Sequence, residues 1–250
     1  MIEAPTACIL IIGDEILSGR TQDTNIKYVA GRLAALGIKL KEARVVPDAP
    51  AAIVAAVNTC RALYTYVFTT GGIGPTHDDI TTVCIAQAFG RRVMRHPDAV
   101  KKMTAFYKGD LNDARLKMAE VPDGDGVVLI ENHVTSAPGY CIENVFVMAG
   151  VPNIAQAMFE AAVPLLRQGE PVFSGSVDGE VREGDIAADL TALQEKYPAV
   201  SLGSYPSIRN NRLSTSIVAR STDKGLIVQA LEDVAVMMRR FGAEPVTHQP

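Results

Sequence analysis

Apolar residues in the first 165 or so positions follow two alternating patterns, short continuous runs and sets spaced three or four residues apart. The runs are typical of buried strands, and they cover residues 8–12, 40–46, 64–69, 127–130 and 145–148. The spaced sets predict helices over 23–36, from 50 through 60, from 80 to about 90, from 97 through 106, and over 153–166. Strands that alternate with helices favour an α/β fold, a three-layer sandwich with a mostly parallel central sheet.

The pattern changes after Gly169-Glu170-Pro171, which has the composition of a hinge. We therefore divide the chain into a first domain, residues 1–168, and a smaller α+β domain, residues 169–250. In the second domain we expect strands at 172–177, 200–205 and 212–219 and helices at 184–197 and 226–241. The tail after Gly242 is expected to be frayed, and Pro164 should distort the last turn of the preceding domain's final helix.

Composition narrows the class of protein. The chain is 48% hydrophobic and 21% charged with a net charge of -4, as in a soluble protein with a full core, and it has no basic excess for nucleic acid. The early apolar run at 7–12 is too short to cross a bilayer, and no Lys or Arg precedes it, so we expect neither a membrane span nor a signal peptide. The cysteines Cys8, Cys60, Cys84 and Cys141 form no Cys-x-x-Cys pair, which favours free thiols in the cytoplasm over structural zinc.

Candidate chemistry is concentrated where the strand at 64–69 gives way to a helix. This segment reads Thr69-Thr70-Gly71-Gly72-Ile73-Gly74-Pro75-Thr76-His77-Asp78-Asp79. Glycines let backbone N–H groups approach a phosphate, the threonine hydroxyls could donate hydrogen bonds, and the acids could hold a metal. The alternatives are a plain tight turn and a helix cap at Asp78 or Asp79. Since parallel sheets bind ligands at the carboxyl ends of their strands, Asp14, Asp48 and this segment could form one site.

Three motifs together resemble the molybdopterin-binding domain family, and the similarity extends over roughly residues 4–166. They are Gly13-Asp14-Glu15-Ile16-Leu17-Ser18-Gly19, Asp23-Thr24-Asn25 and the segment from Thr69 to Thr81. The similarity is strongest to the CinA (competence/damage-inducible) group and to the amino-terminal part of eukaryotic FAD synthases. Residues 202–206, Leu-Gly-Ser-Tyr-Pro, more loosely resemble the middle domain of CinA. The chain ends before any amidase or FAD-synthase domain, so the resemblance does not imply those activities.

The resemblance places the family's two site aspartates at Asp48 and Asp79 and implies a pterin or dinucleotide ligand and a divalent cation. Two carboxylates beside a diphosphate would repel it unless a hard cation such as Mg²⁺, Mn²⁺ or Co²⁺ lay between them, and Asp14 is the third candidate ligand. Asp14 and Glu15 could instead cap a turn. Asn25 is expected either to bond a pterin edge or to cap its helix, and Pro138-Gly139 either to bring backbone close to the ligand or to form a plain turn.

The resemblance leaves three functions open. The leading hypothesis is a metal-dependent nucleotide pyrophosphatase acting on ADP-ribose or FAD. The first alternative is a molybdopterin-binding protein of molybdenum-cofactor biosynthesis without catalysis, and the second is molybdopterin adenylylation. Family members associate as dimers or trimers, which implies a homo-oligomer. Relatives often have glycine where this chain has Thr135, and many have Leu-Pro-Gly-x-Pro in place of Met148-Ala149-Gly150-Val151-Pro152, which bears on the ligand more than on the fold.

Overall fold

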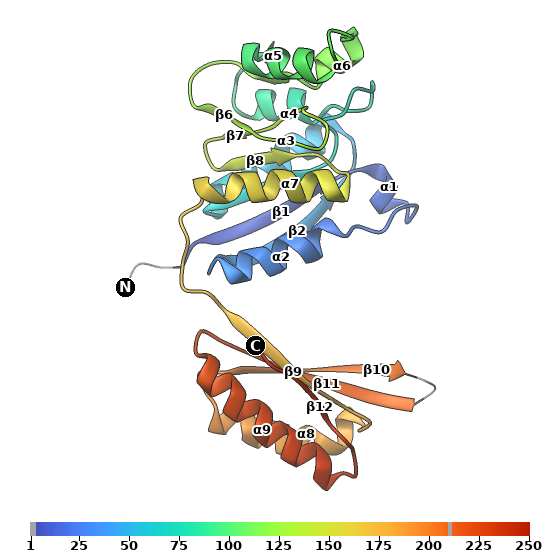
Figure 1. The fold of residues 1–250 in the computed structure, drawn as a ribbon, viewed down its shortest axis with the longest axis vertical. Coiled ribbons are helices and arrows are strands. Elements are labelled where there is room, and N and C mark those ends of the chain that lie inside the picture. Colours follow the sequence, from blue (N-terminus) through green and yellow to red (C-terminus); the bar gives the residue numbers. More distant parts are fainter. Residues whose placement is uncertain (1–3, 210–211) are drawn as a thin grey trace. The chain divides into compact units, whose positions relative to one another are not determined.

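The structure is a computed structural model that describes residues 4–209 and 212–250. It divides into two compact units (Figure 1). The first contains the described residues up to Leu33 together with Gly37–Gly169, and the second contains Ala34–Leu36 and Glu170–Pro250. Among the described residues, every helix is too short or too polar to cross a bilayer.

A six-stranded mixed sheet forms the centre of the first unit. Its strands, in spatial order, are β2 (Lys39–Val46), β1 (Thr6–Ile12), β3 (Tyr66–Thr70), β8 (Val145–Met148), β7 (Gly139–Ile142) and β6 (Val127–Ile130). The first four of these run parallel, and β7 runs antiparallel to both of its neighbours. The predicted α/β fold with a mostly parallel sheet is therefore confirmed.

Helices cover both faces of this sheet because side chains of each strand alternate between them. Cys8, Leu10 and Ile12 of β1 pack in one core with apolar residues of α3 (Pro50–Leu63) and α4 (Thr81–Ala88). On the opposite face, where α2 (Asn25–Ala35) and α7 (Pro152–Ala162) lie in Figure 1, the Phe68 ring is 5.2 Å from that of Phe159. The last turn of α7 gives way to a 3-10 segment, Val163–Leu165, as Pro164 predicts.

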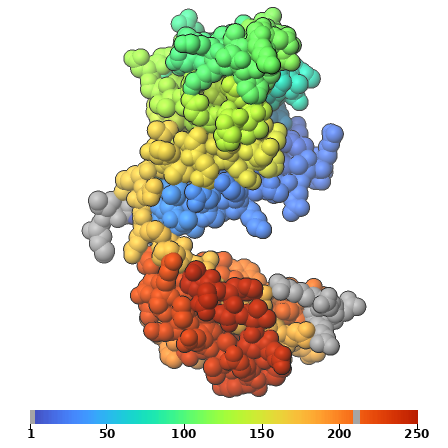
Figure 2. Space-filling model, in the orientation of Figure 1, coloured from blue at the N-terminus to red at the C-terminus, as the bar shows by residue number. Residues whose placement is uncertain are grey.

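One segment of the first unit contains elements that the sequence pattern did not predict. It comprises β4 (Val93–Arg95), α5 (Pro97–Phe106), α6 (Asp113–Lys117) and β5 (Glu120–Pro122), and only α5 was expected. The three-residue strands β4 and β5 pair with each other, and a small core around Ala99, Met103 and Ala119 fills the space between the helices. Figure 2 shows this segment in green, where it forms one end of the unit.

The second unit is an α+β domain, as predicted. Its antiparallel sheet has the order β10 (Ser201–Arg209), β11 (Arg212–Ser221), β9 (Phe173–Gly179) and β12 (Val246–His248), and its helices are α8 (Glu183–Lys196) and α9 (Lys224–Arg240). Seven residues of α9 are buried in its core, including the expected pair Met237 and Met238. The expectation of a frayed tail was wrong, because β12 pairs with the edge of β9 that β11 leaves free.

Candidate functional site

The carboxyl ends of four parallel strands meet at one edge of the first unit's sheet. Gly13 follows β1, Asp48 follows β2, Gly71 follows β3 and Gly150 follows β8. Backbone hydrogen bonds join these ends, from the Gly13 amide to the Val46 carbonyl and from the Gly71 amide to the Met148 carbonyl, each over 3.2 Å. The candidate site residues of the sequence thus come from segments that the topology brings together.

The glycine loop, which we define as Gly71–Pro75, has a backbone that other residues would not accept. Gly71 and Gly72 have φ angles of +103° and +67°, and a Cβ on Gly71 would lie 2.1 Å from the Ile12 carbonyl oxygen. Thr81, the first residue of α4, holds the loop by donating from its amide to Gly72 and from its hydroxyl to Gly71, each over 2.9 Å. In the part of the chain that the structure describes, the amides of Gly72, Ile73 and Gly74 have no protein acceptor.

Asp79 closes the turn after this loop. Its carboxylate accepts hydrogen bonds from the amide (2.8 Å) and the hydroxyl of Thr76, and a Cβ on Gly74 would lie 2.7 Å from it. The Thr76 hydroxyl also lowers the pKa of the neighbouring Asp78 carboxyl. Neither acid caps α4, because that helix begins only at Thr81 and its N-terminus has no side-chain cap. The helix-cap alternative for these two acids is therefore wrong.

A cavity of about 530 Å³ opens beside the glycine loop. We call it the large cavity. On one side it is lined by the loop, Glu15 and Asp79, and its other walls are mostly apolar, formed by residues that include Tyr107, Met118, Pro138, Val151, Ile154 and Met158. The amino-terminal end of α7, which has no side-chain cap, borders the same cavity. A ligand there would meet unpaired amides and a helix N-terminus on one side and an apolar wall on the other.

A second depression, about 490 Å³ in volume, collects most of the predicted metal ligands. We call it the acid hollow, and it is lined by Asp14, Glu15, Ser18, Arg20, Asp48, Asp78 and Ile80. Asp14 begins α1 (Asp14–Leu17), a short helix that the sequence pattern did not predict. The Asp14 amide donates to the Asp48 carboxylate over 3.0 Å, and the Asp48 amide donates to the Asp14 carboxylate over 3.3 Å.

The structure thus divides the predicted acids between two depressions. Asp14, Asp48 and Asp78 line the acid hollow, Asp79 lines the large cavity, and Glu15 lines both. Asp14, Asp48 and Asp79 do not form a compact set of ligand atoms. Over residues 4–209 and 212–250, a group of three or more metal-ligating side chains whose ligand atoms lie within 4.8 Å of one another occurs only elsewhere, at Cys8, Glu42 and Cys60.

Three predicted ligand contacts are buried below the site. The side chains of Thr69 and Thr70 are at most 1% exposed, and neither hydroxyl has a hydrogen-bond partner. Asn25 donates from Nδ2 to the Gly150 carbonyl over 2.9 Å, and its buried Oδ1 has no partner. Asn25 does not cap α2, since Asp23 accepts from the Ile26 amide at that position. Thr70 and Asn25 instead line a small cavity of about 60 Å³ that Gly71 and Gly150 also border.

The two residues of the Pro138-Gly139 pair have different positions, one at the large cavity and one in the sheet. Pro138 lines the large cavity, whereas Gly139 is the first residue of β7, where a Cβ would lie 2.4 Å from the Val147 carbonyl oxygen. Gly139 is therefore required by packing within the sheet. The preceding loop is organised by Asn132, which donates to the Ala137 carbonyl over 2.9 Å and accepts from the Val134 amide over 2.9 Å.

Sequence reasoning missed part of the large cavity's lining. Tyr107 follows α5 and Met118 follows α6, and neither belongs to a motif, so no local signal connects them to the glycine loop. Thr135, noted only as a departure from the glycine of relatives, also lines this cavity. It therefore lies where a larger side chain changes the space for a ligand.

Comparison with known proteins agrees with this architecture. Residues 8–168 match the family model described as "Probable molybdopterin binding domain". The chain belongs to this molybdopterin-binding domain family. Residues 171–244 match the model described as "FAD synthase, middle domain".

The similarity to CinA extends to a solved structure. The first unit resembles the crystal structure of the protein CinA from Thermoplasma acidophilum, with 32% identity and a TM-score of 0.60 over 64% of this chain and 97% of that one. A CinA-like protein of Salinibacter ruber is 33% identical over 94% of this chain and 60% of its own length. A protein of Aeropyrum pernix is 36% identical over 82% of this chain and 81% of its own.

The similarity to FAD synthases also covers both units. A probable FAD synthase of Caenorhabditis briggsae is 27% identical over 94% of this chain but only 49% of its own length. The chain therefore spans about half of that relative and 60% of the CinA-like one. It is a CinA-like molybdopterin-binding domain protein with similarity to FAD synthase.

Proposed function

We propose that the large cavity binds a dinucleotide through its diphosphate and that the protein is a metal-dependent nucleotide pyrophosphatase of the ADP-ribose or FAD class. The observation that carries the proposal is the position of the Gly72, Ile73 and Gly74 amides, which have no protein acceptor and border a cavity with apolar walls. Free amides in a glycine loop suit phosphoryl oxygens, and apolar walls suit a flat aromatic base.

Different parts of the large cavity would bind the diphosphate and the base. The loop amides donate to the diphosphate, and the uncapped N-terminus of α7 adds the positive end of its helix dipole. Tyr107, Met118 and Ile154 offer the apolar surface for the base. Thr81 fixes the loop by donating hydrogen bonds to the carbonyls of Gly71 and Gly72. These bonds do not involve the loop amides, which stay available to a ligand.

The acid hollow has the donor chemistry for a hard divalent cation. Asp14 and Asp48 would hold it, because their carboxylates lie in one hollow and carboxylate oxygens are the ligands that Mg²⁺ and Mn²⁺ prefer. A cation there supplies charge neutralisation and polarisation of a phosphoryl group. Asp79 fits this role less well, because Thr76 already engages its carboxylate. Glu15, which borders both depressions, is placed to orient the attacking water and accept its proton.

The test is release of AMP. The purified protein is incubated with ADP-ribose or FAD and with Mg²⁺, Mn²⁺ or Co²⁺, and AMP is quantified by chromatography. We expect metal-dependent release that falls at least about a hundredfold in Asp48→Asn and is unchanged in Asp125→Asn, an exposed acid in a distant turn. Release that is absent, or equal in wild type and Asp48→Asn, would contradict the proposal.

A second candidate function, molybdopterin binding without catalysis, is favoured by one observation. Asp14, Asp48 and Asp79 do not form a compact metal-ligand set, and the large cavity is complete without the acid hollow. Calorimetric titration with molybdopterin separates the two functions. Binding that is undiminished in Asp48→Asn, together with no hydrolysis, would favour the carrier, whereas hydrolysis that requires Asp48 would favour the enzyme.

A further inference from the structure

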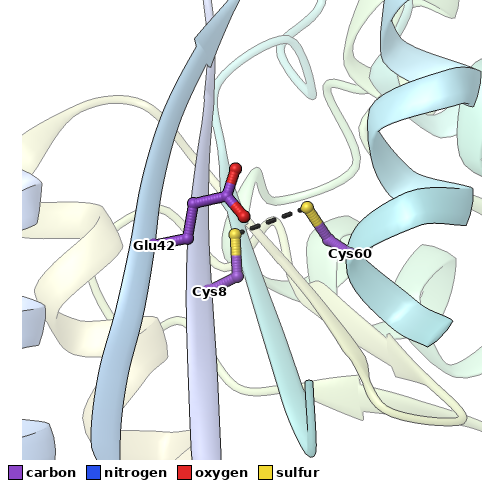
Figure 3. A group of neighbouring side chains, drawn as sticks. All are labelled: Cys8, Glu42 and Cys60. Atoms are coloured by element: carbon purple, nitrogen blue, oxygen red, sulfur yellow. Dashed lines mark hydrogen bonds between the residues drawn. The ribbon is translucent and has the colours of Figure 1, made fainter. Parts of the chain in front are cut away.

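Cys8, Glu42 and Cys60 form a cluster away from the glycine loop (Figure 3). Their ligand atoms all lie within 4.8 Å of one another, and the two sulfur atoms are 3.4 Å apart. Both thiols are completely buried, and the Glu42 side chain is 26% exposed. The residues come from β1, β2 and α3, so the cluster joins three elements of the first unit.

The fold, and not a local motif, assembles this cluster. Cys8 and Glu42 are register partners in the parallel strands β1 and β2, so their side chains leave the sheet on the same face. Helix α3 covers that face and directs Cys60 toward Cys8. A spacing rule for zinc motifs cannot detect such a site, because the two cysteines are 52 positions apart.

The carboxylate of Glu42 is held in place by two donors. Arg44 donates from Nε to Oε1 and Tyr64 donates from its hydroxyl to Oε2, each over 2.7 Å. Arg44 Nη2 also lies 2.6 Å from Oε1, so Oε1 faces two N–H donors, whereas Oε2 keeps a further lone pair for a metal. Outer partners of this kind are what orient a carboxylate ligand in metal sites.

The distance between the sulfur atoms distinguishes a metal site from a disulfide. A disulfide needs sulfur atoms about 2.05 Å apart. Two thiolates on one tetrahedral zinc, with Zn–S bonds of about 2.3 Å, lie about 3.7 Å apart. From the observed 3.4 Å, metal binding requires a movement of a few tenths of an ångström, and a disulfide requires closure by more than 1 Å.

The charges also balance around a divalent ion. Two thiolates and one carboxylate carry three negative charges, and Arg44 with a divalent cation supplies three positive ones. A buried charged group is tolerated when it is paired in this way. Glu42 is the member of the cluster that is partly exposed to solvent, with 26% of its side chain accessible.

We propose that Cys8, Cys60 and Glu42 bind a thiophilic divalent cation of the zinc class, which joins β1, β2 and α3. Three protein ligands leave one tetrahedral position to solvent. On binding, the two thiols release their protons and no electrons are transferred. The site is independent of the proposed pyrophosphatase function, because it uses no residue of the large cavity or the acid hollow.

Cobalt titration tests this proposal, since thiolate-to-cobalt charge-transfer absorption reports sulfur ligation and not carboxylate sites. The full chain, reduced with a phosphine and freed of metal by a chelator, is titrated with Co²⁺ under argon. We expect the absorption to saturate at one Co²⁺ per chain and to disappear on addition of Zn²⁺. Absence of the absorption, or a Cys8–Cys60 disulfide in its place, would overturn the proposal.

Variants identify the ligands. Cys8→Ser and Cys60→Ser should lose the absorption, and Glu42→Gln should weaken Co²⁺ binding at least about tenfold. Cys141→Ser, which changes a buried thiol of β7 outside the cluster, should leave it unchanged. If the cysteine variants fail to fold, Glu42→Gln still tests the ligand assignment. Its side chain is partly exposed, so we expect this variant to fold. Absorption that persists in folded Cys60→Ser, or Co²⁺ affinity unchanged in Glu42→Gln, would overturn the assignment.

Discussion

The backbone amides of Asp14 and Asp48 each donate a hydrogen bond to the carboxylate of the other residue. Asp14 follows β1 and Asp48 follows β2, so this reciprocal pair joins two strand ends and holds two negative charges close together. Amide donors stabilise each carboxylate but do not remove their mutual repulsion. A cation in the acid hollow would remove it, which makes this pair the centre of the proposed metal chemistry.

Two substitutions of Asp48 should separate its charge from its hydrogen bond. Asp48→Asn keeps an acceptor for the Asp14 amide, so we expect a stability change below about 1 kcal/mol with loss of metal-dependent AMP release. Asp48→Ala removes the acceptor too and should lower the free energy of unfolding by about a further 1 kcal/mol. Urea denaturation and AMP release measure the two effects. Equal stability of the two variants would show that the hydrogen bond contributes nothing.

Alanine at Gly72 should impair both folding and ligand binding. A Cβ there would lie 2.2 Å from Thr81 Oγ1, and the φ of +67° disfavours any side chain. We expect destabilisation of about 2–4 kcal/mol, from backbone strain plus displacement of Thr81. Gly19 is a matched control, because its φ is +72° and no atom lies within 4 Å of the added Cβ. Gly19→Ala should cost only about 1 kcal/mol.

Thermal or urea denaturation of the two glycine variants gives the comparison. A Gly72→Ala protein no less stable than Gly19→Ala would mean that the loop relaxes without Thr81, contrary to the observed packing.

The sequence pattern predicted the elements that local periodicity controls. Strands at 127–130 and 145–148 were predicted with their observed bounds, and α3 begins at Pro50 as expected. Strand β12 was missed because it has three exposed residues of which only Val246 is apolar, too few to form a pattern, and its pairing depends on the free edge of β9. Gly139 was considered for the ligand, but its constraint comes from the carbonyl of Val147, which is visible only once β7 and β8 pair.

The candidate site was predictable to the level of strand ends. The topology brings Asp14, Asp48 and the glycine loop to one edge, as parallel strands require. Which depression each carboxylate faces depends on the turn between Thr76 and Asp79 and on the position of Glu15, and neither follows from periodicity. The sequence therefore predicted that all of these acids share one site, whereas the structure divides them between the large cavity and the acid hollow.

Asn25 should position the amino-terminal end of α7 through Gly150. Asn25→Ala leaves the Gly150 carbonyl without the side-chain donor of Asn25, and we expect a loss of about 1 kcal/mol in the free energy of unfolding. Asn25→Asp should be worse, because it buries a carboxylate that faces that carbonyl. Chemical denaturation at pH 7 measures whether stability falls from wild type to Asn25→Ala to Asn25→Asp. An Asn25→Asp protein as stable as Asn25→Ala would contradict it.

Glu42 and Tyr64 should give the protein a pH dependence at both ends of the scale. The Tyr64 hydroxyl, and then Arg44, lower the pKa of Glu42 from 4.5, and the bond to Glu42 raises the pKa of Tyr64 from 10.0 to about 12. The Glu42 contribution is present above its unfolded pKa and is lost as pH falls through the lower folded pKa. The Tyr64 contribution is present below pH 10 and is lost as pH rises toward 12.

Tyr64→Phe should therefore flatten both limbs of the stability profile. Urea midpoints of wild type and variant, measured in chelator from pH 3 to 6 and from pH 9 to 12, provide the test. Tyr107→Phe is the control and should follow the wild type. A variant that keeps the full alkaline loss of wild type would assign that loss to another group.

A crystal structure of Asp48→Asn soaked with ADP-ribose would test the central claim most directly, because it locates a diphosphate that the variant cannot rapidly hydrolyse. We expect its density within hydrogen-bonding distance of the Gly72 and Gly74 amides, with the adenine against Tyr107 and Ile154 in the large cavity. Density for the nucleotide at any other place, with the large cavity empty, would contradict it.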